Sequence, residues 1–156
     1  MRFLYITLLL FPFILFAQEE LPAMSIDIDE YQITKQIQVA KVGDKLRLKN
    51  LNFYGGTDKI TTESEPELNK LIDILNNKPN LKIEIQGHIC CYNEAFNELS
   101  HQRAAAVYHY LVKRGISKKR LAATGFGGSR PIHKIPENDE WEREANRRVE
   151  IEIKAI

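Results

Sequence analysis

The chain has 156 residues, of which 44% are hydrophobic and 28% charged, with 22 Lys and Arg against 21 Asp and Glu. This length suffices for one domain, and the near-zero net charge provides no long-range attraction for nucleic acid. Two cysteines are too few for a disulfide framework or a four-thiolate zinc site, and no apolar run reaches the roughly 18 residues of a membrane-spanning helix. Composition therefore predicts one small globular domain that does not bind nucleic acid.

Residues 1–17 have the layout of a secretory signal peptide. Arg2 precedes the apolar run of residues 3–16, and Ala17 is followed by the polar residues 18–20. At about 1.5 Å per residue this run is shorter than a hydrocarbon core about 30 Å thick, which favours cleavage after Ala17 over a retained anchor. We expect an extracytoplasmic protein with no transmembrane span after cleavage.

Residues 18–43 are mostly polar, and we interpret them as an N-terminal linker or a short edge strand that ends at the turn signal Gly43-Asp44. Apolar residues alternate over 45–53 and change phase at Asn50, which predicts a strand with an irregularity there. Ser64, with Glu67 three residues later, is expected to cap a helix over 65–76.

Periodicity also predicts the later elements. Residues 81–86 alternate as a strand, 98–114 carry one apolar helical face, 121–126 form a strand, 127–143 a loop, and 147–154 a last strand. This order predicts an α+β fold in which two helices cover one face of a sheet.

Six motifs occur in order along residues 45–154, and together they carry a family resemblance. They are Leu51-x-Phe53, Ile83-x-Ile85-x-Gly87-His88, Leu99-Ser100-x-x-Arg103-Ala104, Gly115-Ile116, Gly125-x-Gly127-x-x-x-Pro131 and Asn146-Arg147-Arg148-Val149-Glu150. In this order and spacing the chain resembles the OmpA-like C-terminal domain, a periplasmic module of outer-membrane protein A, peptidoglycan-associated lipoproteins and flagellar motor stators.

The resemblance implies that residues 44–156 form a β-α-β-α-β-β two-layer sandwich with a mixed sheet. It further implies a location in the periplasm, associated with the outer membrane or cell wall, and non-covalent binding of the peptidoglycan stem peptide at its diaminopimelate residue. The family is not catalytic and needs no cofactor, so we expect a binding protein with peptidoglycan as its partner. A second partner from the outer membrane or envelope is left open.

The expected ligand explains the choice of site residues. The diaminopimelate side chain ends in a carboxylate and an ammonium on one carbon, which an Arg fork and a carboxylate would bind. In the family the Arg that matches Arg103 holds the carboxylate, and a position in the first turns of a helix adds to its attraction for anions. Arg147 has the strand parity of Val149 and should face the helices as a second anion contact. Asn97 and Ser100 are expected as supporting donors.

The chain departs from the family where the ammonium should bind. The family's strand ends in Gly-His-Thr-Asp, whereas here Gly87-His88 is followed by Ile89-Cys90-Cys91. Glu94 or Glu98 could replace the missing acid, although neither matches its position. Because of this departure, three alternatives stay open: the protein binds a different stem peptide, it binds the usual one weakly, or it has lost the ligand pocket and does not bind.

The two adjacent cysteines suggest an alternative function. His88, Cys90 and Cys91 are residue types that bind zinc or copper, but adjacent cysteines on an extended chain point apart, so we predict no metal site. In an oxidising compartment, Cys90 and Cys91 could instead form a vicinal disulfide or remain two thiols. The alternatives to wall binding are therefore a redox- or metal-responsive envelope module that uses this loop, and an envelope-complex subunit without a ligand pocket.

Overall fold

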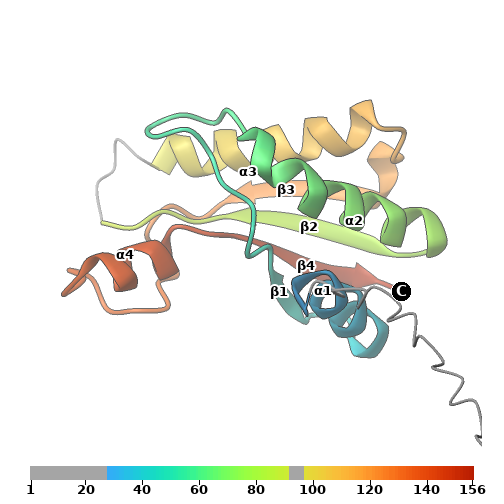
Figure 1. The fold of residues 1–156 in the computed structure, drawn as a ribbon, viewed down its shortest axis with the longest axis horizontal. Helices are drawn as coiled ribbons and strands as arrows, with labels where there is room; N and C mark the ends of the chain where they lie inside the picture. Colours follow the sequence, from blue (N-terminus) through green and yellow to red (C-terminus); the bar gives the residue numbers. More distant parts are fainter. Residues whose placement is uncertain (1–27, 92–96) are drawn as a thin grey trace, which may run out of the picture.

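The computed structural model describes residues 28–91 and 97–156, and within them the chain folds around a four-stranded mixed sheet (Figure 1). The strands are β1 (Lys45–Arg47), β2 (Lys82–Gly87), β3 (Leu121–Gly125) and β4 (Val149–Ala155), in the spatial order β1-β4-β2-β3. β4 pairs antiparallel with both β1 and β2, whereas β2 and β3 are parallel. This topology confirms the predicted α+β fold with a mixed sheet.

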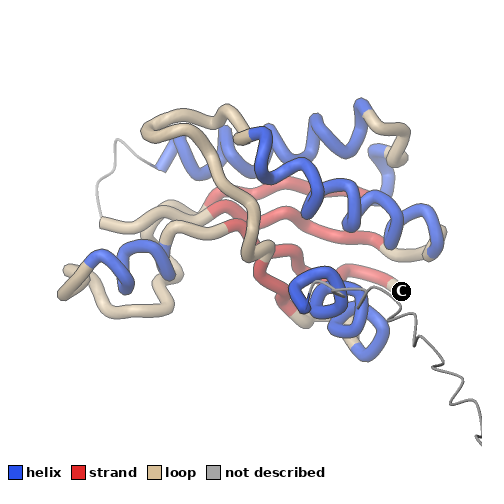
Figure 2. The backbone as a smooth tube through the Cα atoms, viewed as in Figure 1, coloured by secondary structure: helices blue, strands red, loops and turns tan. Residues whose placement is uncertain are grey.

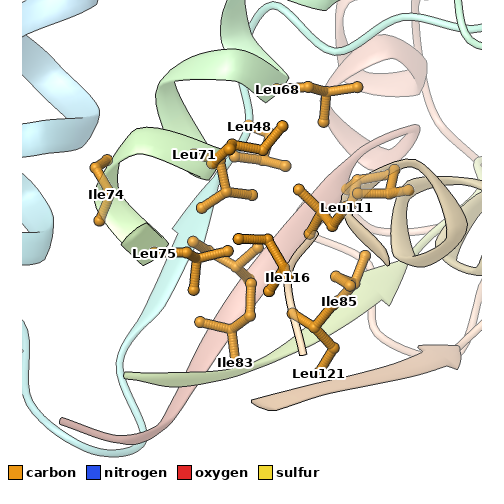
Figure 3. Close-up of a cluster of buried hydrophobic side chains, with 14 of the residues drawn as sticks. Leu48, Leu68, Leu71, Ile74, Leu75, Ile83, Ile85, Leu111, Ile116 and Leu121 are labelled. Atoms are coloured by element: carbon orange, nitrogen blue, oxygen red, sulfur yellow. The ribbon is translucent and has the colours of Figure 1, made fainter. Parts of the chain in front are cut away.

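Two helices, α2 (Glu65–Asn77) and α3 (Asn97–Lys113), cover the same face of the sheet, as predicted (Figures 1 and 2). α3 lies between β2 and β3 in the chain, so it forms the crossover that parallel strands require. The core lies between these layers (Figure 3). Its most deeply buried side chains come from α2, α3, β2 and β4 and include Leu68, Leu71, Leu75, Ile83, Ile85, Leu111, Ile151 and Ile153.

The N-terminal segment differs from the prediction, because residues 28–39 form helix α1 (Ile28–Val39) where we expected a linker or edge strand. Ile33 and Ile37, one helical turn apart, are 4% and 2% exposed and belong to the main core. Figure 3 shows Ile74 projecting from α2 towards α1. Among residues 33–39, the part of α1 whose side chains the structure describes, two buried residues make too narrow an apolar stripe for a clear helical period. The predicted signal peptide, residues 1–17, lies outside the described residues.

The segment between β1 and α2 also differs from the prediction. β1 ends at Arg47, and the chain returns to extended pairing only at a single bridge between Phe53 and Ile60. A 3-10 turn, η1 (Thr62–Ser64), precedes α2, and Ser64 makes no side-chain cap bond. Its buried hydroxyl instead accepts from the Asn52 amide at 2.7 Å and donates to the Asn52 carbonyl at 3.1 Å. Ser64 therefore holds residues 48–61, which we call the 50s loop, against the start of α2.

A short helix, α4 (Glu140–Asn146), interrupts the segment 127–143 that we predicted as a loop. The Asp139 carboxylate caps it by accepting from the Glu142 amide at 2.9 Å. α4 lies at the same end of the sheet as the N-terminus of α3 (Figure 2). Within the described part of the chain, no helix has the length and apolar character needed to cross a membrane.

Candidate functional site

The N-terminal turns of α3 lie directly on the ends of β2 and β3, because both strands end in glycine. A Cβ at Gly87 would overlap the backbone carbonyl oxygen of Ser100, and one at Gly125 would lie 2.7 Å from the Cα of His101. Only a residue without a side chain permits so close an approach. This contact sets the position of Arg103, less than one helical turn further along α3.

A hollow of about 490 Å³, the arginine cavity, opens between the 50s loop, α3 and α4. It is lined by Leu51, Asn52, Phe53, Gly55, Gly56, Arg103, Glu140, Glu144 and Arg147. A second hollow of about 230 Å³, the cysteine pocket, shares Gly56 and both arginines and adds Ile89, Cys90, Cys91 and Leu99. The two hollows therefore meet at the two guanidinium groups.

Arg103 is held from one side only. Its Nε donates to the Thr57 carbonyl at 3.0 Å, and its guanidinium carbon lies 4.9 Å from the centre of the Phe53 ring. Among the described residues, its two terminal nitrogens have no hydrogen-bond partner. Partial burial, and then the nearby charge of Arg147, lower the pKa of Arg103, although a guanidinium stays charged in proteins. Arg103 thus presents unused donors and a partly desolvated charge to the cavity.

Arg147 also lines the cavity, while the side chain of its neighbour Arg148 pairs with Glu150. One terminal nitrogen of Arg147 pairs with the Glu140 carboxylate, and the other donates to the Cys90 sulfur at 3.3 Å. Burial opposes the charged form, but these two acceptors outweigh it and raise the pKa of Arg147. Arg147 is therefore the more fully engaged of the two cations.

On the other face of the sheet, Arg148 forms a buried polar group with two neighbours. Its Nε donates to Glu150 Oε1 at 2.6 Å, and the second oxygen of Glu150 lies 3.5 Å from Nε2 of His88. His88 is 2% exposed and its ring stacks on Phe126, with centroids 5.6 Å apart. Burial lowers the pKa of His88, so its ring is neutral near pH 7.

The carboxylates that line the arginine cavity, Glu140 and Glu144, both come from α4, which sequence analysis missed. Glu140 is committed to Arg143 and Arg147, whereas the exposed Glu144 side chain has no ion pair within the described ranges. Asp139, followed three residues later by Glu142, is a capping pattern that could have revealed this helix.

The acids proposed from sequence lie elsewhere. Glu98 is exposed at the start of α3 and lines neither the arginine cavity nor the cysteine pocket. Glu94 lies outside the described residues. The structure therefore offers Glu144, not Glu98, beside the two arginines.

The structure does not bring Asn97 and Ser100 to the arginines. Ser100 is fully buried, and its hydroxyl donates to the Asn97 carbonyl at 2.6 Å and accepts from the Gly127 amide at 2.9 Å. Asn97 lines a separate hollow of about 270 Å³ beside His101, Gly125 and Gly127. Both residues thus secure the turn after β3, and Ser100 has no free hydroxyl for ligand binding or nucleophilic attack.

The two cysteines are free thiols with their sulfur atoms 2.6 Å apart. From the sequence we predicted that their side chains point apart, and this prediction is wrong, because the backbone turns at Cys91, whose φ is +57°. Across the described residues, no group of three or more His, Cys, Asp or Glu side chains is placed to hold a metal ion.

Comparison with known proteins agrees with the motifs. The model of the OmpA family matches residues 52–147. Over 119 residues the chain is 34% identical to outer membrane porin F of Pseudomonas fluorescens, covering 74% of this chain and 36% of that protein. Over 90 residues it is 38% identical to the peptidoglycan-binding protein ArfA of Mycobacterium tuberculosis, covering 55% of this chain and 26% of that one.

Among solved structures, the chain is similar to a MotB-like protein from Desulfovibrio vulgaris, with a TM-score of 0.64 and 26% identity. That match covers 72% of this chain and 73% of the other. By contrast, the chain spans only 13% to 36% of the length of the curated relatives it matches. The similarity therefore concerns one domain of those larger proteins.

Proposed function

This chain belongs to the OmpA family, and we propose that it binds peptidoglycan non-covalently in the cell envelope through the cavity around Arg103 and Arg147. The observation that carries this proposal is the pair of partly buried guanidinium groups in one open cavity, of which Arg103 keeps its terminal donors unused. The sequence similarity to ArfA, a peptidoglycan-binding protein, also supports it.

The chemistry of the cavity fits a zwitterionic group such as the end of a diaminopimelate side chain. Arg103 would bind the carboxylate through a forked, charge-assisted contact, because its terminal nitrogens are free. Glu144 would accept the ammonium, since it is the lining carboxylate that is not already paired. In this proposal α4 supplies the acid that the family carries after its second strand and that Ile89-Cys90-Cys91 replaces here.

The proposed role is binding without catalysis. Ser100 is buried and has both its hydrogen-bonding functions occupied, so it offers no nucleophile to the cavity. We place the protein in the periplasm, at the outer membrane or cell wall, with its signal peptide removed. We further propose an outer-membrane or envelope protein as a second partner.

Co-sedimentation with purified peptidoglycan of the diaminopimelate type tests the proposal. Losing a hydrogen bond to a charged group costs about 1.5–3 kcal/mol, so Arg103→Ala should weaken binding roughly 10-fold to 150-fold. Glu144→Gln should weaken it by a smaller factor, because this side chain is exposed. Arg114→Ala is the matched control: it removes the same charge from the turn directly after α3, where Arg114 contacts Asn69 and Tyr110 away from the cavity.

Peptidoglycan with lysine in the stem peptide adds a second comparison, because lysine has the ammonium but not the side-chain carboxylate. Wild-type protein should bind it weakly, and Arg103→Ala should change that binding little. If Arg103→Ala sediments with the diaminopimelate-type wall as wild type does, the proposed site is wrong. If wild type binds neither wall, the alternative of an envelope-complex subunit without a ligand pocket is favoured.

A further inference from the structure

The cysteine pair is held in a fixed position at the edge of the ligand cavity. After β2, the His88 amide donates to the Arg148 carbonyl at 2.9 Å and the Ile89 amide to the Gly127 carbonyl at 3.1 Å, so the chain is anchored up to Cys90. The Cys91 amide then donates to Glu137 Oε1 at 3.1 Å, with Cys91 in the left-handed region. These contacts turn two adjacent side chains towards each other, with their sulfurs 2.6 Å apart.

The two thiols have different surroundings. Arg147 Nη1 donates to the Cys90 sulfur at 3.3 Å, a contact that stabilises developing negative charge on this sulfur. Burial, together with the contact to Cys90, raises the pKa of the Cys91 thiol to about 11, so Cys91 stays protonated near neutral pH. Both residues are only partly buried and line the cysteine pocket, which is accessible from solvent. Such a pair has one attacking thiol and one resolving thiol.

We propose that Cys90 and Cys91 form a thiol–disulfide exchange site on the wall of the ligand cavity. The Cys90 thiolate attacks an incoming disulfide, forms a mixed disulfide with one of its sulfurs and releases the other as a thiolate. The Cys91 thiol then gives its proton to solvent and attacks the Cys90 sulfur, which releases the second thiolate. The pair loses two electrons and two protons and gains one S–S bond, and the incoming disulfide is reduced to two thiols.

Oxidation of the pair should change how the cavity binds anions, and this consequence alone rests on the proposed function. In the reduced protein the Cys90 sulfur occupies one donor of Arg147. A disulfide sulfur is a poorer hydrogen-bond acceptor than the sulfur of a reduced cysteine, so oxidation frees that donor for a ligand carboxylate. Because one hydrogen bond contributes about 0.5–1.5 kcal/mol net, the oxidised protein should bind the wall roughly 2-fold to 10-fold more tightly.

The exchange step is tested on the purified chain with oxidised glutathione as the incoming disulfide, followed by mass spectrometry. Wild type should lose two hydrogen masses and keep no glutathione. Cys91→Ser should stop with one glutathione on Cys90, whereas Cys90→Ser should react much more slowly. Arg147→Gln should slow the alkylation of Cys90 by iodoacetamide at neutral pH, while Arg114→Gln, which removes a charge that contacts Asn69 and Tyr110 away from the cysteines, should leave it nearly unchanged.

Three results would overturn the proposal: wild type that retains glutathione, faster reaction at Cys91 than at Cys90, or a disulfide between two chains. Wall binding is then compared between the reduced and oxidised proteins. If neither form binds peptidoglycan while the exchange proceeds as described, the proposed function fails and the exchange site stands. If both forms bind equally, the coupling to Arg147 is wrong.

Discussion

Substituting Gly87 tests the close contact on which the geometry of the site depends. A Cβ at this position would overlap the Ser100 carbonyl oxygen and lie 3.1 Å from its carbon, with the Ala104 Cβ at 3.5 Å. The two nearest obstacles are backbone atoms, so no rotamer change can relieve the overlap and α3 must move. Overpacking of this kind costs about 1–3 kcal/mol, and we expect Gly87→Ala to lie at the upper end.

Urea unfolding followed by far-ultraviolet circular dichroism measures this loss. With a slope of about 2 kcal/mol per molar urea, a loss of about 3 kcal/mol lowers the midpoint by roughly 1.5 M. Gly55→Ala is the matched control, because nothing lies within 4 Å of the added Cβ and the midpoint should hardly change. Equal midpoints for Gly87→Ala and wild type would refute the close packing of α3 on β2. Because this contact positions Arg103, Gly87→Ala should also weaken wall binding under native conditions.

Three further predictions concern stability. Ser64→Ala should cost about 0.5–1.5 kcal/mol in urea unfolding because it removes the hydrogen bonds between the buried Ser64 hydroxyl and the Asn52 backbone, whereas the exposed Ser117→Ala should cost little; equal losses would contradict this role. Acid should destabilise the fold from about pH 6.5 downwards, since burial lowers the pKa of His88 and the unfolded chain takes up that proton first. Burial opposes ionisation of Glu150, but His88 and Arg148 outweigh it and lower its pKa from 4.5 to about 2. The stability difference between wild type and Glu150→Gln should therefore shrink as the pH falls from 4.5 to 2, and a difference independent of pH would exclude this contribution.

The elements that sequence predicted well are those with a long, regular apolar period. Residues 65–76 and 98–114 were expected as helices and form α2 and α3, while 81–86 and 147–154 became β2 and β4 to within two residues. The helices that were missed have few buried residues among the side chains that the structure describes: residues 33–39 of α1 contribute Ile33 and Ile37 to the core, and α4 buries only Ala145 and Asn146. Ser64 was predicted to cap α2, but its hydroxyl bonds the Asn52 backbone instead. The sequence cannot distinguish these two roles, because both need the same hydroxyl group.

The sequence by itself determined the family and the mixed sheet with its helical layer, because local periodicity decides which side of an element is buried. Tertiary structure alone decided what surrounds the two arginines. Glu140 and Glu144 reach the cavity through α4, Asn97 and Ser100 are used to hold the turn after β3, and the two sulfurs meet because Cys91 adopts a left-handed conformation. Each of these outcomes depends on contacts between segments far apart in the chain or on a backbone turn, and neither leaves a periodic signal in the sequence.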